Sequence, residues 1–166
     1  MATPTTLPAE FVSGAVLTAQ QQNDLRGAFR VMQVVYGNTT TAVSSSTNTY
    51  VDTGLTATIT PTSASSKILV FVSQPCDKSA ANANNYILLR LMRGATSVLE
   101  ITRSGLFTGT TLVINGSESA TYLDSPATTS ATTYKTQFAS GNNTAAVSVQ
   151  PSSVAYATIV LMEISA

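Results

Sequence analysis

Short segments in which apolar and hydroxyl side chains alternate are the feature that most constrains the fold of this chain. Leu55, Ala57 and Ile59 alternate with threonines, and this period of two places the apolar side chains on one face of a strand. Similar segments recur along the chain with turn-forming residues between them. They predict strands at residues 30–36, 55–60, 67–72, 86–93, 98–102, 111–115, 120–123, 132–139, 145–149 and 155–164.

Many short strands with turns between them are typical of an antiparallel sandwich or barrel. We therefore expect an all-β domain over residues 31–166, an antiparallel β-sandwich or barrel. Residues 86–93 are long enough for a helix, but the strands predicted on both sides and Gly94 directly afterwards favour a strand. Residues 158–164 are almost continuously apolar, which predicts a central strand covered on both faces.

Residues 1–30 have a different pattern and are expected to form an N-terminal extended arm and one short helix. Residues 1–16 contain two prolines and no apolar period. Thr18 and Gln21 have the spacing of a capping box at a helix start. Leu25, Ala28, Phe29 and Met32 follow at helical spacing, so we expect this helix to pack on its own domain, a sister chain or another protein.

Composition argues against most enzymes, because the chain has no histidine, no tryptophan and one cysteine. Imidazole bases, Ser-His-Asp arrangements and His/Cys zinc sites are thereby excluded. Three aspartates beside predicted turns, Asp52, Asp77 and Asp124, are expected to cap those turns rather than to bind a cation. Cys76 is expected to be a small, partly buried residue. We therefore predict no catalytic residues, no cofactor and no metal.

The charge balance argues against nucleic acid and membrane partners. Eight basic and eight acidic residues give no net charge, and the basic residues are scattered, whereas nucleic-acid binding needs them clustered. The longest apolar run, residues 68–72, is far shorter than a membrane-spanning helix. The first residues lack the pattern of a secretory signal. The 27 threonines and 20 serines instead favour a shell or fibre component surrounded by its own copies, with a monomeric sandwich as the alternative.

Three stretches resemble small structural proteins of tailed bacteriophages, of the tail fibre and appendage type found in phages of marine and cyanobacterial hosts. Residues 11–23, FVSGAVLTAQQQN, are similar to the G-x-V-L-T-A-x-x-x-N openings of many fibre and appendage proteins. The second stretch is residues 50–67, and the third combines residues 122–135 with residues 159–164. The resemblance covers most of the chain.

This resemblance implies a non-enzymatic virion protein, assembled in the host cytoplasm as a homotrimeric knob, and it implies a jelly-roll-like antiparallel β-sandwich as the fold of that knob. Residues 1–30 would dock on other virion proteins and residues 31–166 would project outward. The docking side chains expected in the first segment are Phe11, Val16, Leu17, Leu25 and Phe29. A capsid decoration protein that stabilises the head is one alternative. A monomeric carbohydrate-binding module is another, although such modules usually offer tryptophan platforms.

A knob at a fibre tip would contact a host surface glycan or protein through its loops. The loops richest in Asn, Ser and Gly are expected at 77–85, 103–110, 115–119 and 140–144. The candidate receptor residues are Asn82, Asn84, Asn85, Tyr86 and Phe107, with the two aromatic rings as stacking surfaces for a sugar. Alternatively, Tyr86 begins a buried strand and Phe107 fills a gap between subunits.

Overall fold

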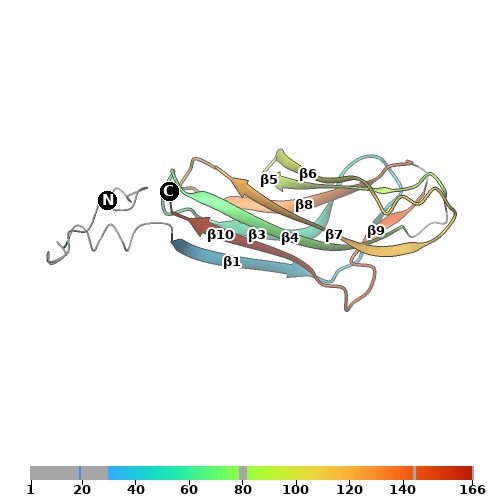
Figure 1. The fold of residues 1–166 in the computed structure, drawn as a ribbon, viewed down its shortest axis with the longest axis horizontal. Helices are drawn as coiled ribbons and strands as arrows, with labels where there is room; N and C mark the ends of the chain where they lie inside the picture. Colours follow the sequence, from blue (N-terminus) through green and yellow to red (C-terminus); the bar gives the residue numbers. More distant parts are fainter. Residues whose placement is uncertain (1–18, 20–29, 79–81, 144, 166) are drawn as a thin grey trace, which may run out of the picture.

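The computed structural model describes residues 19, 30–78, 82–143 and 145–165, and these residues form a sandwich of antiparallel strands (Figure 1). The strands are β1 (Val31–Thr39), β2 (Val43–Ser45), β3 (Val51–Ile59), β4 (Lys67–Lys78), β5 (Ile87–Arg93), β6 (Thr96–Gly105), β7 (Ile114–Asp124), β8 (Thr132–Ser140), β9 (Val147–Val149) and β10 (Ala157–Ile164).

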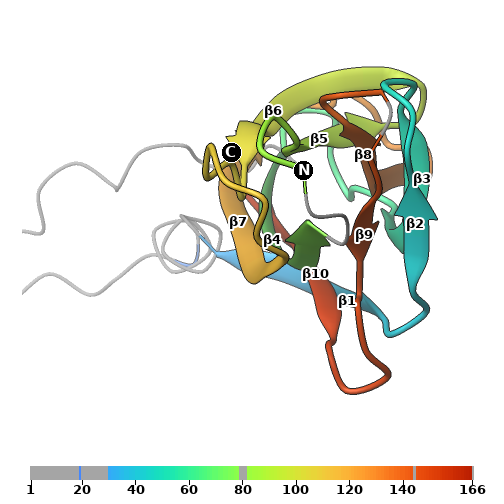
Figure 2. The ribbon, with the colours of Figure 1, turned by 90° about the vertical axis from the view of Figure 1, so that its right-hand side faces the viewer.

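Two sheets pack face to face, as the view along the sandwich shows (Figure 2). The six-stranded sheet has the order β1-β10-β4-β9-β2, with β7 paired along the other edge of β4. The four-stranded sheet has the order β3-β8-β5-β6. The predicted all-β antiparallel sandwich is therefore confirmed. The expected arm and helix lie outside the described residues, apart from Ala19, which is helical.

The core between the sheets consists of two apolar clusters separated by a buried polar ladder. One cluster includes Leu55 and Val70, and the other includes Phe138 and Val149. The ladder lies between them because β3, β8 and β4 each place one polar side chain between the inward apolar positions of the two clusters, and the fourth member directly follows β9. It consists of four buried side chains joined by hydrogen bonds, in the order Thr53, Thr136, Gln74 and Gln150.

The strand β1 begins at one end of the sandwich, and three of the loops lie at the opposite end. At one end β1 begins beside the last residues of β10, where the Ser165 amide donates to the Arg30 carbonyl over 2.9 Å (Figure 1). The loops that follow β4, β6 and β8 lie at the opposite end. The 12 residues of β4 run between the two, which corresponds to roughly 40 Å of extended chain.

Two strands are longer than the sequence predicted. β4 continues through Lys78, so the expected polar loop at 77–85 begins later than predicted. Residues 114–124 form the single strand β7 where two strands and a turn at Asn115-Gly116 were predicted, so the loop expected at 115–119 is wrong. The reason is pairing with β4 along the whole of β7, from Ile114 opposite Lys78 to Asp124 opposite Ile68. This tertiary pairing outweighs the local turn preference of Asn-Gly.

The apolar last strand, β10, has the central position that was expected, between β1 and β4. Its burial alternates between buried and half-buried residues, so within the described chain only one of its faces is covered. The expectation of cover on both faces is therefore wrong for the single chain. Met32, which continued the helical spacing of Leu25, Ala28 and Phe29, lies in β1, so that period ends before residue 31.

Candidate functional site

A buried lysine joins two of the predicted receptor loops at the loop end of the sandwich. Lys78 is the last residue of β4 and its side chain is fully buried. Its Nζ donates hydrogen bonds to the Asn82 carbonyl over 3.0 Å, to Thr108 Oγ1 over 2.9 Å and to the Thr110 carbonyl over 2.9 Å. The three donors of the ammonium group are thereby all used. No local pattern predicts that Lys78 fixes these loops, because its role depends on contacts with residues 30 and 32 positions away.

The three candidate asparagines occupy very different environments. Asn84 is exposed, and its backbone amide donates to Asn82 Oδ1 over 2.9 Å. Asn82 Oδ1 also accepts a hydrogen bond from Asn142 Nδ2 over 3.1 Å, which links this loop to the one after β8. Asn85 is fully buried, and its Nδ2 donates to the carbonyls of Ala145 and Ala146. Asn85 therefore holds the loops together and presents no surface to a ligand.

The two candidate aromatic residues lie beside each other. The rings of Tyr86 and Phe107 meet edge to face, with their centroids 6.2 Å apart. Tyr86 is half-buried and lies directly before β5, with its ring close to Gly141. Phe107 is 52% exposed. The structure thus brings the candidate receptor residues together at one end, and Phe107 and Asn84 are the members most accessible to solvent.

A second surface of interest is the outer face of the six-stranded sheet. Successive rows of side chains cross β1, β10, β4 and β7 on this face, following the strand register. Two adjacent rows are apolar except for one threonine at the end of the second, Thr121. We call the apolar members of these rows the apolar face: Val34, Met162, Leu69 and Leu123 in the first row, and Tyr36, Val160 and Phe71 in the second.

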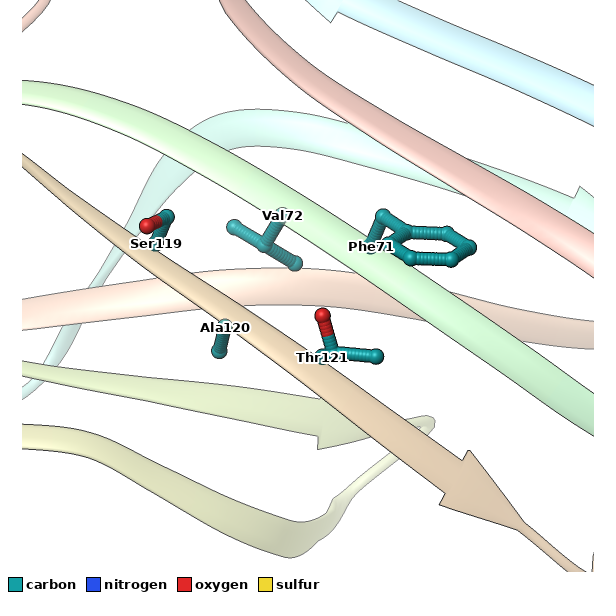
Figure 3. A pocket seen from close by; sticks show the side chains of 5 residues that line it. All are labelled: Phe71, Val72, Ser119, Ala120 and Thr121. Atoms are coloured by element: carbon teal, nitrogen blue, oxygen red, sulfur yellow. The ribbon is translucent and has the colours of Figure 1, made fainter.

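The apolar face is largely open to solvent in the single chain. Tyr36 and Leu123 are each 57% exposed, and Phe71 is 38% exposed. The next row contains only Asn38 and hydroxyl side chains, and Lys67 borders the face at the end where β1 begins. A shallow hollow of about 250 Å³ lies beside Phe71, where β7 contributes only the small residues Ser119, Ala120 and Thr121 (Figure 3).

The outer face of the four-stranded sheet has the opposite character. Asp52, Gln137, Arg90 and Glu100 form one row across its four strands. Gln137 Nε2 donates to Asp52 Oδ1 over 2.7 Å, and the Arg90 guanidinium donates to Gln137 Oε1. Arg90 also lies over the ring of Tyr50, 3.8 Å from its centroid. The two outer faces therefore differ sharply, one charged and internally hydrogen-bonded and the other apolar.

The ionisable groups considered from the sequence do not form a catalytic or metal-binding arrangement in the described residues. Asp52 is bound by Lys135 and Gln137, and the hydrogen bond from Lys135 holds its pKa below the usual value. Asp124 accepts hydrogen bonds from Arg93 and Tyr134 and therefore does not cap a turn as predicted.

Cys76 is fully buried in the core, whereas partial burial was expected. Burial raises the pKa of its thiol to about 12, so the reactive thiolate is scarce at neutral pH. Within the described ranges, no group of three or more potential metal-ligating His, Cys, Asp or Glu side chains occurs. No helix in the same part of the chain is long and apolar enough to span a membrane.

The candidate docking residues Phe11, Val16, Leu17, Leu25 and Phe29 lie outside the described residues. Sequence reasoning missed the apolar face as a site. Its signal was present in residues 158–164, where apolar side chains occupy both faces of the strand. The same signal is visible in β1, where Val34 and Tyr36 alternate with the core-facing Val35.

Fold and surfaces together define an all-β sandwich protein with a loop-bearing end and one apolar sheet face. Comparison with protein-family models gave no match, and neither did comparison with curated protein sequences.

Proposed function

We propose that this chain is a non-enzymatic structural protein of a tailed-bacteriophage particle, a homotrimeric knob of a fibre or appendage. In this proposal residues 1–30 attach the knob to other virion proteins. The loops at the far end contact a glycan or protein of the host surface. The protein is assembled in the host cytoplasm and functions in the virion.

The observation that carries this proposal is that β1 begins at one end of the sandwich and the candidate receptor loops lie at the other. The chain enters β1 at the end opposite the candidate receptor loops, with the length of β4 between them. An attachment segment at one end and loops at the other is the arrangement that a projecting knob requires. Loops fixed to a rigid scaffold are also the usual carriers of recognition.

The chemistry of the loop end is suited to a polar, uncharged ligand such as a glycan. Asn84 offers amide donors and acceptors, and Phe107 offers an exposed ring edge close to Tyr86. Lys78 and Asn85 hold the loops by buried hydrogen bonds, which lowers the conformational entropy lost when a ligand binds.

The test uses phage particles that carry variants of this chain. Deletion of residues 2–29 should leave the sandwich folded by circular dichroism while abolishing incorporation of the chain into particles. The double variant Asn84→Ala/Phe107→Ala should be incorporated normally but reduce adsorption to host cells. Ser97→Ala, an exposed change away from the loop end, should alter neither property.

Other outcomes would overturn the proposal. If the loop variant adsorbs normally and particles without the chain have fragile heads, the protein is a capsid decoration protein. If the purified chain is a monomer that binds glycans and is absent from particles, it is a carbohydrate-binding module. Absence from particles without glycan binding would exclude every virion role.

A further inference from the structure

The apolar face is the largest feature of the sandwich that neither the core nor the loop end explains. Its seven side chains come from four neighbouring strands and are not interrupted by any charge. Hydroxyl side chains would keep such a face soluble, as they do in the neighbouring row that contains Ser73 and Ser119. Exposed apolar surface of this kind commonly marks an interaction site.

The segment that precedes β1 has the residues needed to cover this face. Residues 17–29 contain Leu17, Leu25, Ala28 and Phe29 at spacings that predict an amphipathic helix. With the predicted cap at Thr18, the helix would contain residues 19–29, and 11 helical residues are about 16 Å long. Four neighbouring strands span roughly 14 Å from first to last, so such a helix can cross the whole apolar face.

The point where this segment ends determines which copy it can cover. A helix packed on a sheet lies with its axis about 10 Å above the strands. The apolar period of the segment continues to Phe29, and β1 begins at Val31, so only Arg30 separates them. The two Cα–Cα steps from Phe29 to Val31 span at most about 7 Å, which is less than this rise and leaves no length for the chain to reverse over its own sheet.

We propose that residues 17–29 of one copy lie as a helix across the apolar face of a neighbouring copy. This inference rests on the homotrimer of the proposed function and names the contact that holds it together. The contact is heterologous, joining a segment of one copy to a sheet face of the next, and three such contacts close into a ring. Residues 1–16 remain free to reach other virion proteins, so this inference narrows the attachment proposed for residues 1–30 to residues 1–16.

The face offers a specific place for a large side chain of the incoming helix. The hollow beside Phe71 is bordered by small residues of β7, and its volume of about 250 Å³ accommodates an aromatic ring. Phe29 and Leu25 are the largest apolar side chains in the second half of the segment. We expect these two residues to contribute most to the contact, since buried large side chains dominate interfaces.

A photo-crosslinking experiment on the full-length protein tests this contact directly. A benzoylphenylalanine residue replaces Leu123 on the apolar face, and equal amounts of ¹⁵N-labelled and unlabelled chains are refolded together. After irradiation, mass spectrometry should find crosslinks to residues 17–29, including pairs that join a labelled chain to an unlabelled one. The same photoreactive residue at Thr58, on the outer face of the other sheet, should give no such crosslinks.

A second measurement leaves the apolar face unchanged, in case the photoreactive residue at Leu123 itself weakens the contact. Leu25→Ser/Phe29→Ser removes two large apolar side chains from the proposed interface and should weaken the trimer. The protein concentration below which the trimer dissociates should therefore rise about tenfold or more. Asn23→Ala in the same segment, a polar position outside the apolar period, should leave dissociation unchanged.

The outcomes separate this inference from the proposed function. Crosslinks from Leu123 confined to single chains, or to strands of a neighbouring copy, would overturn the segment contact while leaving the trimer intact. A trimer whose dissociation is unaffected by Leu25→Ser/Phe29→Ser would do the same. A full-length chain that is monomeric at every concentration would overturn the contact and the homotrimer together.

Discussion

At the scale of single residues, the loop end shows how identical side chains take different roles. Asn84 and Asn85 are adjacent in the sequence, but only Asn85 reaches the segment after β8. Its burial is produced by contacts with residues about 60 positions further along the chain. Local composition could therefore predict an asparagine-rich loop but not which asparagine supports it.

This difference predicts that alanine substitutions at the two positions change stability by different amounts. Asn85→Ala removes the hydrogen-bond partner of the Ala146 carbonyl and of the Tyr86 amide, and should lower the free energy of unfolding by about 1–3 kcal/mol. Asn84→Ala should change it by less than about 0.5 kcal/mol, because the residue is exposed. Urea denaturation of the two variants measures both values, and equal stabilities would contradict the role assigned to Asn85.

Glu163 is a buried carboxylate whose contribution should depend on pH. It accepts hydrogen bonds from Gln33 Nε2 over 2.6 Å and from the Thr62 amide over 2.7 Å. Burial by itself raises the pKa of this group, but hydrogen bonds from Gln33, Thr62 and Ser66 outweigh it and hold the pKa below the usual 4.5. The stabilisation is therefore present above pH 4.5 and is lost as the pH falls through the folded-state pKa.

Glu163→Gln should accordingly destabilise the protein by about 1–3 kcal/mol at pH 7, because the amide cannot accept from all of these donors. The difference from the wild type should shrink as the pH falls below 4.5. Thermal unfolding measured across this pH range checks the expectation. A difference that stays constant with pH would show that the charge of Glu163 contributes nothing.

At the scale of strands, the pattern of apolar and polar residues predicted where a strand lies in the sequence better than where it ends. β3 was located from its period of two, because its apolar side chains face the core, whereas β10 was located from its almost continuous apolar run. The ends of β4 and the continuity of β7 were missed, because Asp77, Lys78, Asn115 and Gly116 have turn-like local preferences. The pairing that overrides these preferences joins residues far apart in the chain and has no local signature.

The close crossing of β1 over β3 gives a prediction at this scale. A Cβ at Gly37 of β1 would meet the Thr56 carbonyl oxygen and would lie 3.0 Å from Ile159 Cγ2. Gly37→Ala should therefore lower the free energy of unfolding by about 1–3 kcal/mol through overpacking. Asn38→Ala, on the exposed side of the same strand, is the matched control and should have little effect. Unchanged stability of Gly37→Ala would mean that the two strands can separate without cost.

At the scale of the whole molecule, the two outer faces of the sandwich indicate how it meets its surroundings. The face of the four-stranded sheet joins its charges in one hydrogen-bonded row, which is suited to water. The face of the six-stranded sheet exposes Tyr36, Phe71 and Leu123 without any charge between them. This asymmetry is what we expect of a subunit that is completed by its own copies.

The mass of the full-length protein in solution tests this account most directly. Light scattering over a range of micromolar concentrations should give three times the chain mass of 17.2 kDa. The chain without residues 1–29 should give the mass of a single sandwich, because the segment that covers the apolar face is gone. A full-length mass of 17.2 kDa throughout would contradict the proposed assembly.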